Sequence, residues 1–325
     1  MTEPRAIVFS KYHGLGNDFI VVADARFDVK RRSRGAEGPL SSASKSYLAR
    51  LARSICDRHT GVGADGLLML SAAREKGHDA RMRVFNADGS EAEMSGNGIR
   101  CAAAYLASRD RATRSLHLET AAGVKSIQSV AVRGRSGHAA RDRSRNGSWI
   151  FRVGMGIPIL DPAKIPFDAG EFPAPIIGFP LSTRNGVAQV TQVTVSSMGN
   201  PHCSVFVPDF ESVNWPELGR EIETNPLFPN RTNVEFIRVI SRSHVEVRFW
   251  ERGVGKTQSS GTGSCAAVVA CVLHGLTERN VRVRTLAGTL QVAWPEAGPQ
   301  GQEGEVTLTG PAEVVAEGTY YFRRS

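Results

Sequence analysis

The sequence of 325 residues has few cysteines and no long apolar run. Its cysteines form no Cys-x-x-Cys pair and no zinc-type grouping with histidine, which argues against a disulfide framework and a metal centre. We therefore expect no metal, and reduced thiols that are mostly buried, at Cys56, Cys101, Cys203, Cys265 and Cys271. No stretch is apolar enough for a membrane span, and the first residues lack the apolar run of a signal peptide. These absences predict a cytoplasmic protein without membrane contact.

Two short segments account for the whole formal net charge of +8. Residues 30–34 contribute +4, and residues 133–145 contribute another +4. Both segments lie in stretches that are rich in glycine and serine, and neither has the interleaved aromatic side chains of a nucleic-acid groove. We interpret them as solvated loop insertions and expect no nucleic-acid partner.

A Gly-rich turn that leads into an apolar helical sequence occurs twice. The first is Glu93–Gly98, which leads into Ile99–Ala104, and the second is Ser259–Gly263, which leads into Ser264–Val269. Free backbone N–H groups and the helix dipole make such turns anion sites. Each turn has a serine at its hinge, so the repeat predicts one substrate held between two matching halves.

The length fits two domains, and the sequence predicts many strands and few helices in each half. One helix is expected over about residues 42–57. Another, at Ala266–Leu276, is apolar on nearly every side and must be enclosed. We expect two separate strands at 305–309 and 313–321, and a linker at 134–147.

These patterns predict an α+β fold of two pseudo-symmetric domains. Each is expected to be a barrel-like, mostly antiparallel sheet around a central helix. The expected boundaries are 1–148 for the first domain, with 311–325 returning to it, and 149–310 for the second.

Three familiar motifs fail on inspection. Gly253–Thr257 resembles the end of a P-loop, but Trp250 occupies the position of its first glycine. Gly61–Gly66 fits a dinucleotide pattern, but it would lie between a helix and a strand, in reverse of the required order. Neither hinge serine has the leading glycine of a hydrolase elbow.

Short polar turns with asparagine are unusually frequent. They are Gly16–Asp18, Phe85–Gly89, Gly96–Gly98, Met198–His202 and Arg231–Asn233. A single such turn is ordinarily only a turn, because asparagine tolerates left-handed backbone. Five of them, beside Glu251-Arg252 at a strand end, favour a zwitterionic amino acid as ligand. Arg252 would pair with its carboxylate and Glu251 with its ammonium group.

These segments resemble the diaminopimelate epimerase family over nearly the whole chain. The matching stretches are Lys11–Phe19, Phe85–Cys101, Met198–Cys203 and Trp250–Cys265. The resemblance implies two halves, each a barrel around a central helix, and an isomerase that needs no cofactor. It implies interconversion of LL- and meso-diaminopimelate, in lysine and peptidoglycan precursor synthesis, by two opposed cysteines that act as acid and base. The expected partner is this small substrate, and a homodimer is left open.

The resemblance also implies the site residues. Side chains expected around the substrate are Asn17, Asn86, Asn200, Asn233, Glu251 and Arg252. Backbone amides expected to hold the reacting carboxylate are those of Gly96, Asn97, Gly261 and Thr262. His202 is expected to support its turn.

Ser95 and Ser260 stand where the family has its two cysteines. A cysteine with a pKa of about 8.5, lowered at a helix N-terminus, can ionise near neutral pH, but a serine hydroxyl needs an adjacent base. Cys101 and Cys265 lie more than a helical turn away and are expected in the core.

Three explanations of the serines stay open: a diverged natural protein, an engineered double replacement, or a relay through a base such as His202. We rank them in that order, since Lys256 replaces a usual acidic residue. The alternative functions are an amino-acid-binding protein without epimerase activity, and an isomerase or dehydratase of another amino acid.

Overall fold

The computed structural model describes residues 5–24, 44–110, 114–130, 147–184, 190–296 and 304–323. The chain divides into unit 1, Met1–Val153 with Gly310–Ser325, and unit 2, Gly154–Thr309. Both basic segments, and all of the expected linker except Gly147, lie outside the described residues. None of the helices in the described ranges has the length and apolar character needed to cross a membrane.

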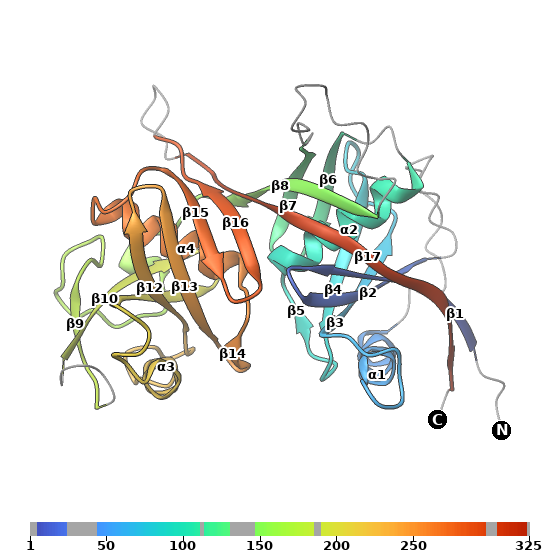
Figure 1. The fold of residues 1–325 in the computed structure, drawn as a ribbon. Coiled ribbons are helices and arrows are strands. Elements are labelled where there is room, and N and C mark those ends of the chain that lie inside the picture. Colours follow the sequence, from blue (N-terminus) through green and yellow to red (C-terminus); the bar gives the residue numbers. More distant parts are fainter. Residues whose placement is uncertain are drawn as a thin grey trace. The chain divides into compact units, whose positions relative to one another are not determined.

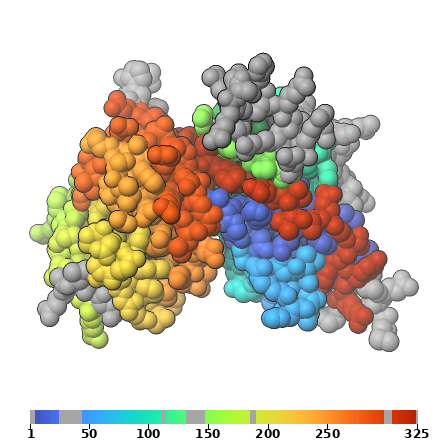
Figure 2. Space-filling view, in the orientation of Figure 1, coloured from blue at the N-terminus to red at the C-terminus, as the bar shows by residue number. Residues whose placement is uncertain are grey.

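Unit 1 is a closed barrel of eight strands around a helix (Figure 1). Its elements are β1 (Arg5–Gly14), β2 (Asn17–Ala23), α1 (Lys45–Cys56), β3 (Gly66–Ser71), β4 (Ala80–Asn86), β5 (Glu91–Ala92), α2 (Gly96–Arg109), β6 (Ser115–Thr120), β7 (Gly123–Ser129), most of β8 (Ser148–Gly156) and most of β17 (Val306–Phe322). The strands pair in the order β1, β2, β3, β4, β6, β7, β8 and β17, and β17 pairs again with β1. The first and last strands lie side by side at the surface, blue and red in Figure 2.

Helices cover both faces of the central strands of unit 1. Eleven of the fourteen residues of α2 are buried, and it packs on β1 to β4 as the central helix. The amphipathic α1 buries Tyr47, Leu48, Leu51 and Ile55 in a cluster that includes Ile20 and Leu67. Strands covered on both faces read as continuous apolar runs, as in Gly66–Leu70.

Unit 2 wraps its sheet around α4 in the same way. Its elements are the 3-10 turn η2 (Pro162–Lys164), β9 (Phe179–Ser182), β10 (Val190–Ser197), β11 (Pro201–Phe206), α3 (Trp215–Glu223), β12 (Asn233–Ser241), β13 (His244–Glu251), β14 (Gly255–Thr257), α4 (Gly261–Leu273), β15 (Asn280–Thr285) and β16 (Gly288–Ala293). The strands pair in the order β9 to β13, β15, β16 and the start of β17. The apolar α4 packs on six of these strands, which confirms that it is enclosed.

The two units repeat one pattern of strand pairing. In unit 1 the β2–β3 and β4–β6 pairs are parallel among antiparallel neighbours, and in unit 2 the β11–β12 and β13–β15 pairs take those places. The helices α1 and α3 each link the second strand of this pattern to the third. The expectation of an α+β fold with two pseudo-symmetric barrel-like halves is therefore confirmed.

Two parts of the fold differ from the sequence prediction. The helix α3 was not predicted, although Trp215, Leu218 and Ile222 recur at helical spacing on its buried side. The two C-terminal strands are one strand, β17. Pro311 lies between the residues that pair with β16 and those that pair with β1, so neither ladder needs its missing N–H.

Candidate functional site

Both Gly-rich turns are helix N-termini with the same geometry. Ser95 caps α2 with φ −133° and ψ 123°, and Ser260 caps α4 with φ −132° and ψ 131°. The Ser95 hydroxyl accepts from the N–H of Gly98 at 3.0 Å, and the Ser260 hydroxyl accepts from that of Gly263 at 3.2 Å. Each serine therefore forms an ordinary N-cap, whatever its chemical role.

The first two N–H groups of each helix are free to bind an anion. Within the described ranges, no acceptor is recorded for the N–H groups of Gly96 and Asn97 in α2, or of Gly261 and Thr262 in α4. The third N–H of each helix goes to the serine hydroxyl. Each turn thus presents two donors at the positive end of a helix dipole.

Hydrogen bonds between amides connect two of the predicted residues of unit 1. Asn97 donates to Asn17 Oδ1 at 3.0 Å, and Asn17 donates to Asp65 Oδ2 at 2.7 Å. Asn86, exposed at the end of β4, donates to Ser90 Oγ at 2.9 Å. The structure thus brings Asn17 and Asn97 into direct contact.

Asp65, which sequence analysis did not select, links these elements. Besides holding Asn17, it accepts the N–H of Ala87, next to Asn86, on its own carbonyl at 3.1 Å. Arg58 Nη2 donates to Asp65 Oδ1 at 2.8 Å. Asp65 lies in the Gly61–Gly66 turn, and its position directly before β3 was the available signal.

A fully buried guanidinium lies behind the first turn of α2. Arg100 donates to the Gly96 carbonyl at 2.9 Å, to Asn97 Oδ1 at 2.7 Å and to the Pro311 carbonyl at 3.1 Å. It therefore fixes the turn that carries Ser95 and places a positive charge beside it. In the sequence it looked like an ordinary polar residue of a helix.

In unit 2 a carboxylate adjoins the hinge serine. Glu251, partly buried at the end of β13, lies near the Ser260 side chain. Burial raises the pKa of Glu251; the nearby Ser260 and His202 side chains oppose the rise, and Glu235 adds to it. Serine and a potential base are thus neighbours here.

His202 lies in the same cluster, between two oxygen atoms. Its Nδ1 is 2.7 Å from Glu235 Oε1, and its Nε2 is 3.0 Å from Asn200 Oδ1. Glu235 was not predicted, because within the sequence of β12 it resembles any polar strand residue.

The Asn233 side chain connects the backbone of Arg252 to that of Pro201. Asn233 Oδ1 accepts the Arg252 N–H at 3.0 Å, and its Nδ2 donates to the Pro201 carbonyl at 2.9 Å. The exposed Arg252 guanidinium donates only to the Asn230 carbonyl among the recorded contacts of the described chain, at 3.3 Å. Glu223, also missed, accepts from Trp250 Nε1 at 2.7 Å and from the Gly253 N–H at 2.8 Å.

Three residues weighed in the sequence lie outside these half-sites. Cys101 and Cys265 are fully buried core residues, as predicted, and burial raises the pKa of Cys101 to about 12. The Lys256 ammonium lies 5.2 Å from the centre of the Trp215 ring, a cation–π contact.

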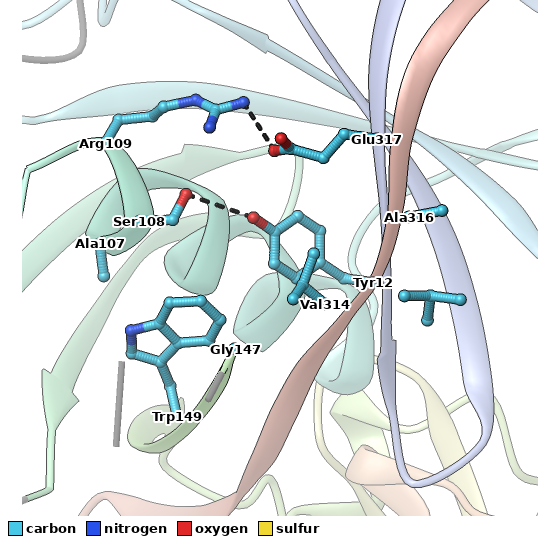
Figure 3. Close-up of a pocket in the computed structure, with 10 residues that line it drawn as sticks. Tyr12, Ala107, Ser108, Arg109, Gly147, Trp149, Val314, Ala316 and Glu317 are labelled. Atoms are coloured by element: carbon cyan, nitrogen blue, oxygen red, sulfur yellow. Dashed lines mark hydrogen bonds and ion pairs between the residues drawn. The ribbon is translucent and has the colours of Figure 1, made fainter. Parts of the chain in front are cut away.

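A cavity in unit 1 contains none of the predicted site residues (Figure 3). It measures about 380 Å³ and lies at the C-terminal end of α2, roughly 20 Å along the helix from Ser95. Tyr12 and Ser108 approach to 3.3 Å on its wall, and Arg109 pairs with Glu317 at 3.0 Å. Burial raises the pKa of Tyr12.

Solved structures with the same fold include an epimerase and a phenazine biosynthesis protein. A hydroxyproline epimerase from Agrobacterium vitis matches with a TM-score of 0.65 and 16% identity, over 98% of this chain and 92% of that one. A phenazine biosynthesis protein of the PhzF family from Bacillus anthracis matches with a TM-score of 0.63 and 18% identity, over 98% and 100%. At these identities the likeness shows the fold alone.

The sequence comparisons identify the family. The diaminopimelate epimerase family model matches residues 9–139 and 194–315. The diaminopimelate epimerase of Pelotomaculum thermopropionicum is 44% identical over 97% of this chain and 99% of its own. Diaminopimelate epimerase 1 of a Nostoc species is 40% identical over 96% and 99%. The chain is an amino-acid epimerase by class, and it belongs to the diaminopimelate epimerase family.

Proposed function

We propose that this chain interconverts LL- and meso-diaminopimelate by moving a proton at the α-carbon without a cofactor. The observation that carries the proposal is the pair of matched helix N-termini in a chain of this family. Each has a serine hydroxyl beside two free N–H groups. The reaction belongs to lysine and peptidoglycan precursor synthesis.

The backbone donors take the carboxylate on the reacting carbon. These donors are the N–H groups of Gly96, Asn97, Gly261 and Thr262. Negative charge spreads onto that carboxylate as the proton leaves, so the donors bind the transition state more tightly than the substrate. The amides of Asn17, Asn86 and Asn200, with Arg252, hold the rest of the zwitterion, and Asn233 fixes the Arg252 turn.

Ser95 and Ser260 occupy the acid–base positions. Glu251 lies near the Ser260 side chain, so it is the group that can take the hydroxyl proton. A hydroxyl remains poorly matched to neutral pH, and we expect a slow reaction.

A second candidate function is binding without inversion. It is favoured by the inequality of the two serines: Glu251 lies near Ser260, whereas no titratable side chain is recorded in an interaction with Ser95 among the described residues. Without a base on that face, the protein would hold diaminopimelate and leave its stereochemistry unchanged.

Exchange of the α-proton in D2O tests both candidates. LL- and meso-diaminopimelate are incubated with the wild-type chain and with Ser95→Cys/Ser260→Cys, while calorimetry measures binding. Exchange with equilibration of the stereoisomers by the wild-type chain supports the epimerase. Binding without exchange, restored in the double cysteine variant, supports the second candidate. If neither protein binds diaminopimelate, both are rejected, and exchange or elimination with another amino acid would identify a different isomerase or dehydratase.

A further inference from the structure

The turn between β13 and β14 is exposed, yet its backbone has a defined conformation. The Val254 N–H donates to the Glu251 carbonyl at 3.0 Å, and Gly253 has a φ of 74° while the φ of Arg252 is negative. This combination is a type II turn. Arg252, Gly253 and Val254 are all exposed, so side-chain packing does not hold this backbone in place. Hydrogen bonds must do so.

The buried carboxylate of Glu223 provides one of these hydrogen bonds. The residue is 5% exposed, and both oxygens accept: Oε1 from the Gly253 N–H at 2.8 Å, and Oε2 from Trp250 Nε1 at 2.7 Å. Arg231 Nη1 also approaches Oε1, at 3.4 Å. The Gly253 N–H belongs to the central peptide of the turn, and a change to a type I turn would rotate that peptide and point the N–H away. The carboxylate therefore selects the type II turn.

The helix that carries Glu223 gains nothing from a carboxylate at this position. Glu223 is the last residue of α3, and the C-terminus of a helix favours a cation over an anion. Burial of a carboxylate also costs free energy, which its hydrogen bonds have to offset. The reason for a glutamate here therefore lies in the turn that it contacts.

The internal repeat gives this arrangement an equivalent in unit 1. Leu68 pairs with the residue two before Asn86 in β4, and Glu235 pairs with the residue two before Glu251 in β13. A Cβ on the third residue of α2 would lie 3.1 Å from Leu68 Cδ2, and one on the third residue of α4 would lie 2.9 Å from Glu235 Oε1. Leu68 and Glu235 are thus equivalent, and so are Asn86 and Glu251.

Unit 1 has uncharged residues at both positions that matter. Cys56 lies twelve residues before Leu68, as Glu223 lies twelve residues before Glu235, and each is the last residue of its helix. Ala87 follows β4 at the place where an arginine follows β13. The fold is therefore built without a carboxylate at the end of α1. The carboxylate occurs in the half whose turn carries an arginine.

The direction of the Arg252 side chain depends on this turn. Among the described residues its guanidinium has one recorded contact, with the Asn230 carbonyl at 3.3 Å, so no carboxylate orients it. Asn233 Oδ1 accepts the Arg252 N–H at 3.0 Å on one side of the residue, and Glu223 accepts the Gly253 N–H on the other. Both peptides that flank Arg252 are therefore held by side chains of unit 2.

We propose that Glu223 is a positioning residue for Arg252: it fixes the peptide that follows Arg252, and so the direction in which the guanidinium leaves the turn toward a substrate carboxylate. The inference rests on the proposed function, because Arg252 is proposed there as a substrate contact. It adds that the turn is ordered before the substrate arrives, so binding does not have to order it.

Exchange of the Gly253 amide proton with solvent tests the hydrogen bond without any substrate. The wild-type protein is labelled with 15N-glycine, and the Gly253 signal is assigned by its loss in Gly253→Asn, since asparagine tolerates a positive φ. We expect this proton to exchange at least about tenfold more slowly in the wild type than in Glu223→Gln. Equal exchange rates in the two proteins would overturn the inference, whatever the protein binds.

Glu223→Gln keeps the shape of the side chain but has one oxygen for two N–H donors. The buried Trp250 N–H takes that oxygen, because the exposed Gly253 N–H can bond to water instead. The amide NH2 then opposes the Gly253 N–H, and the turn loses its fixed peptide. We expect the affinity for diaminopimelate, measured by calorimetry, to fall about tenfold or more.

An exposed carboxylate on the same helix supplies the matched control. Glu217 pairs with Arg220 at 3.3 Å and its side chain is 47% exposed. Glu217→Gln removes the same charge from α3 without touching the turn, so it should bind diaminopimelate as the wild type does.

A rescue experiment separates positioning from a general loss of stability. Trp250→Phe removes the competing donor, so the glutamine of Glu223→Gln can give its oxygen to Gly253. In that background Glu223→Gln should lower the affinity by less than about threefold. Wild-type affinity in Glu223→Gln alone, or an equal loss in both backgrounds, would overturn the inference. If the wild type itself does not bind diaminopimelate, the proposed function fails, and the exchange of the Gly253 proton alone decides on Glu223.

Discussion

The helix N-termini at Ser95 and Ser260 have the same backbone but opposite electrostatic surroundings. Beside Ser95 lie neutral amides and the buried Arg100 guanidinium. Beside Ser260 lies the carboxyl group of Glu251, with the His202–Glu235 pair close to it. At the end of β13, Glu251 takes the place that Asn86 has at the end of β4.

The different charges at the two helix N-termini show that the internal repeat extends to the backbone and not to the surrounding side chains. The repeated backbone gives each half-site a hydroxyl and two N–H donors. The side chains, which are not repeated, set the charge. A nearby cation stabilises an ionised acid–base group, and a nearby carboxylate stabilises its protonated form. The two positions therefore favour different protonation states of an acid–base group placed there.

The largest loss of stability is expected when the buried guanidinium of Arg100 is removed. Arg100→Met leaves the buried Gly96 and Pro311 carbonyls and Asn97 Oδ1 without this donor, so the free energy of unfolding should fall by about 3 kcal/mol or more. Urea denaturation measures the loss. The control Arg109→Met removes a pair that is 38% exposed on the arginine side, and should lose less than about 1 kcal/mol. Equal losses would show that Arg100 has no special part.

A cysteine at each hinge should report its electrostatic surroundings directly. The thiol of Ser95→Cys should have a pKa at least about one unit below that of Ser260→Cys, because Arg100 favours the thiolate and Glu251 opposes it. The pH dependence of alkylation by iodoacetamide measures both. The wild-type chain is the blank, since its free cysteines are buried. The same pKa in both variants, or the reverse order, would refute the contrast.

The N-cap hydrogen bonds of Ser95 and Ser260 should contribute equally to the free energy of unfolding, although the charges around the two serines differ. Ser95→Ala and Ser260→Ala each remove one hydrogen bond to the third N–H of a helix, and each should lower the free energy of unfolding by about 1 kcal/mol. The matched glycine variants should lose only a few tenths of a kcal/mol. Chemical denaturation would contradict the shared geometry if one alanine variant lost nothing.

The smallest effect concerns the charge on Glu251. Burial raises its pKa above an unfolded value of about 4.3, so its favourable contribution is complete below that pH and is lost as the pH rises through the folded pKa. Glu251→Gln should therefore be more stable than the wild type at pH 7.5, by less than about 1 kcal/mol, and no more stable at pH 4. Melting temperatures at both pH values check the sign. An advantage that does not change with pH would contradict it.

Sequence patterns predicted the parts that depend on local rules. The two Gly-rich turns, the apolar α4 and the amphipathic α1 follow from periodicity and capping, and the structure has all of them. The helix α3 was not predicted, because its short apolar pattern was not compared with the corresponding segment of the first half. The internal repeat, applied to α1, would have required a helix there.

The residues that sequence analysis missed act through distant contacts. Arg100 reaches Pro311, and Glu235 reaches His202 on another strand. Nothing local distinguishes a glutamate that points into a barrel from one that faces water, since both fit an alternating strand. Only the pairing register shows that Glu235 lies where unit 1 has a leucine.

The pairing of β1 with β17 makes the order of synthesis matter. Arg5 pairs with Phe322, so the first barrel closes with a segment that is synthesised after unit 2. Until then, β1 is a free strand edge that can pair with other chains. Unit 2 consists of the continuous residues 154–309, so it can fold without a later segment of the chain. A nascent chain therefore completes its second unit before its first, and proteolysis within residues 310–322 would reopen the barrel that was begun first.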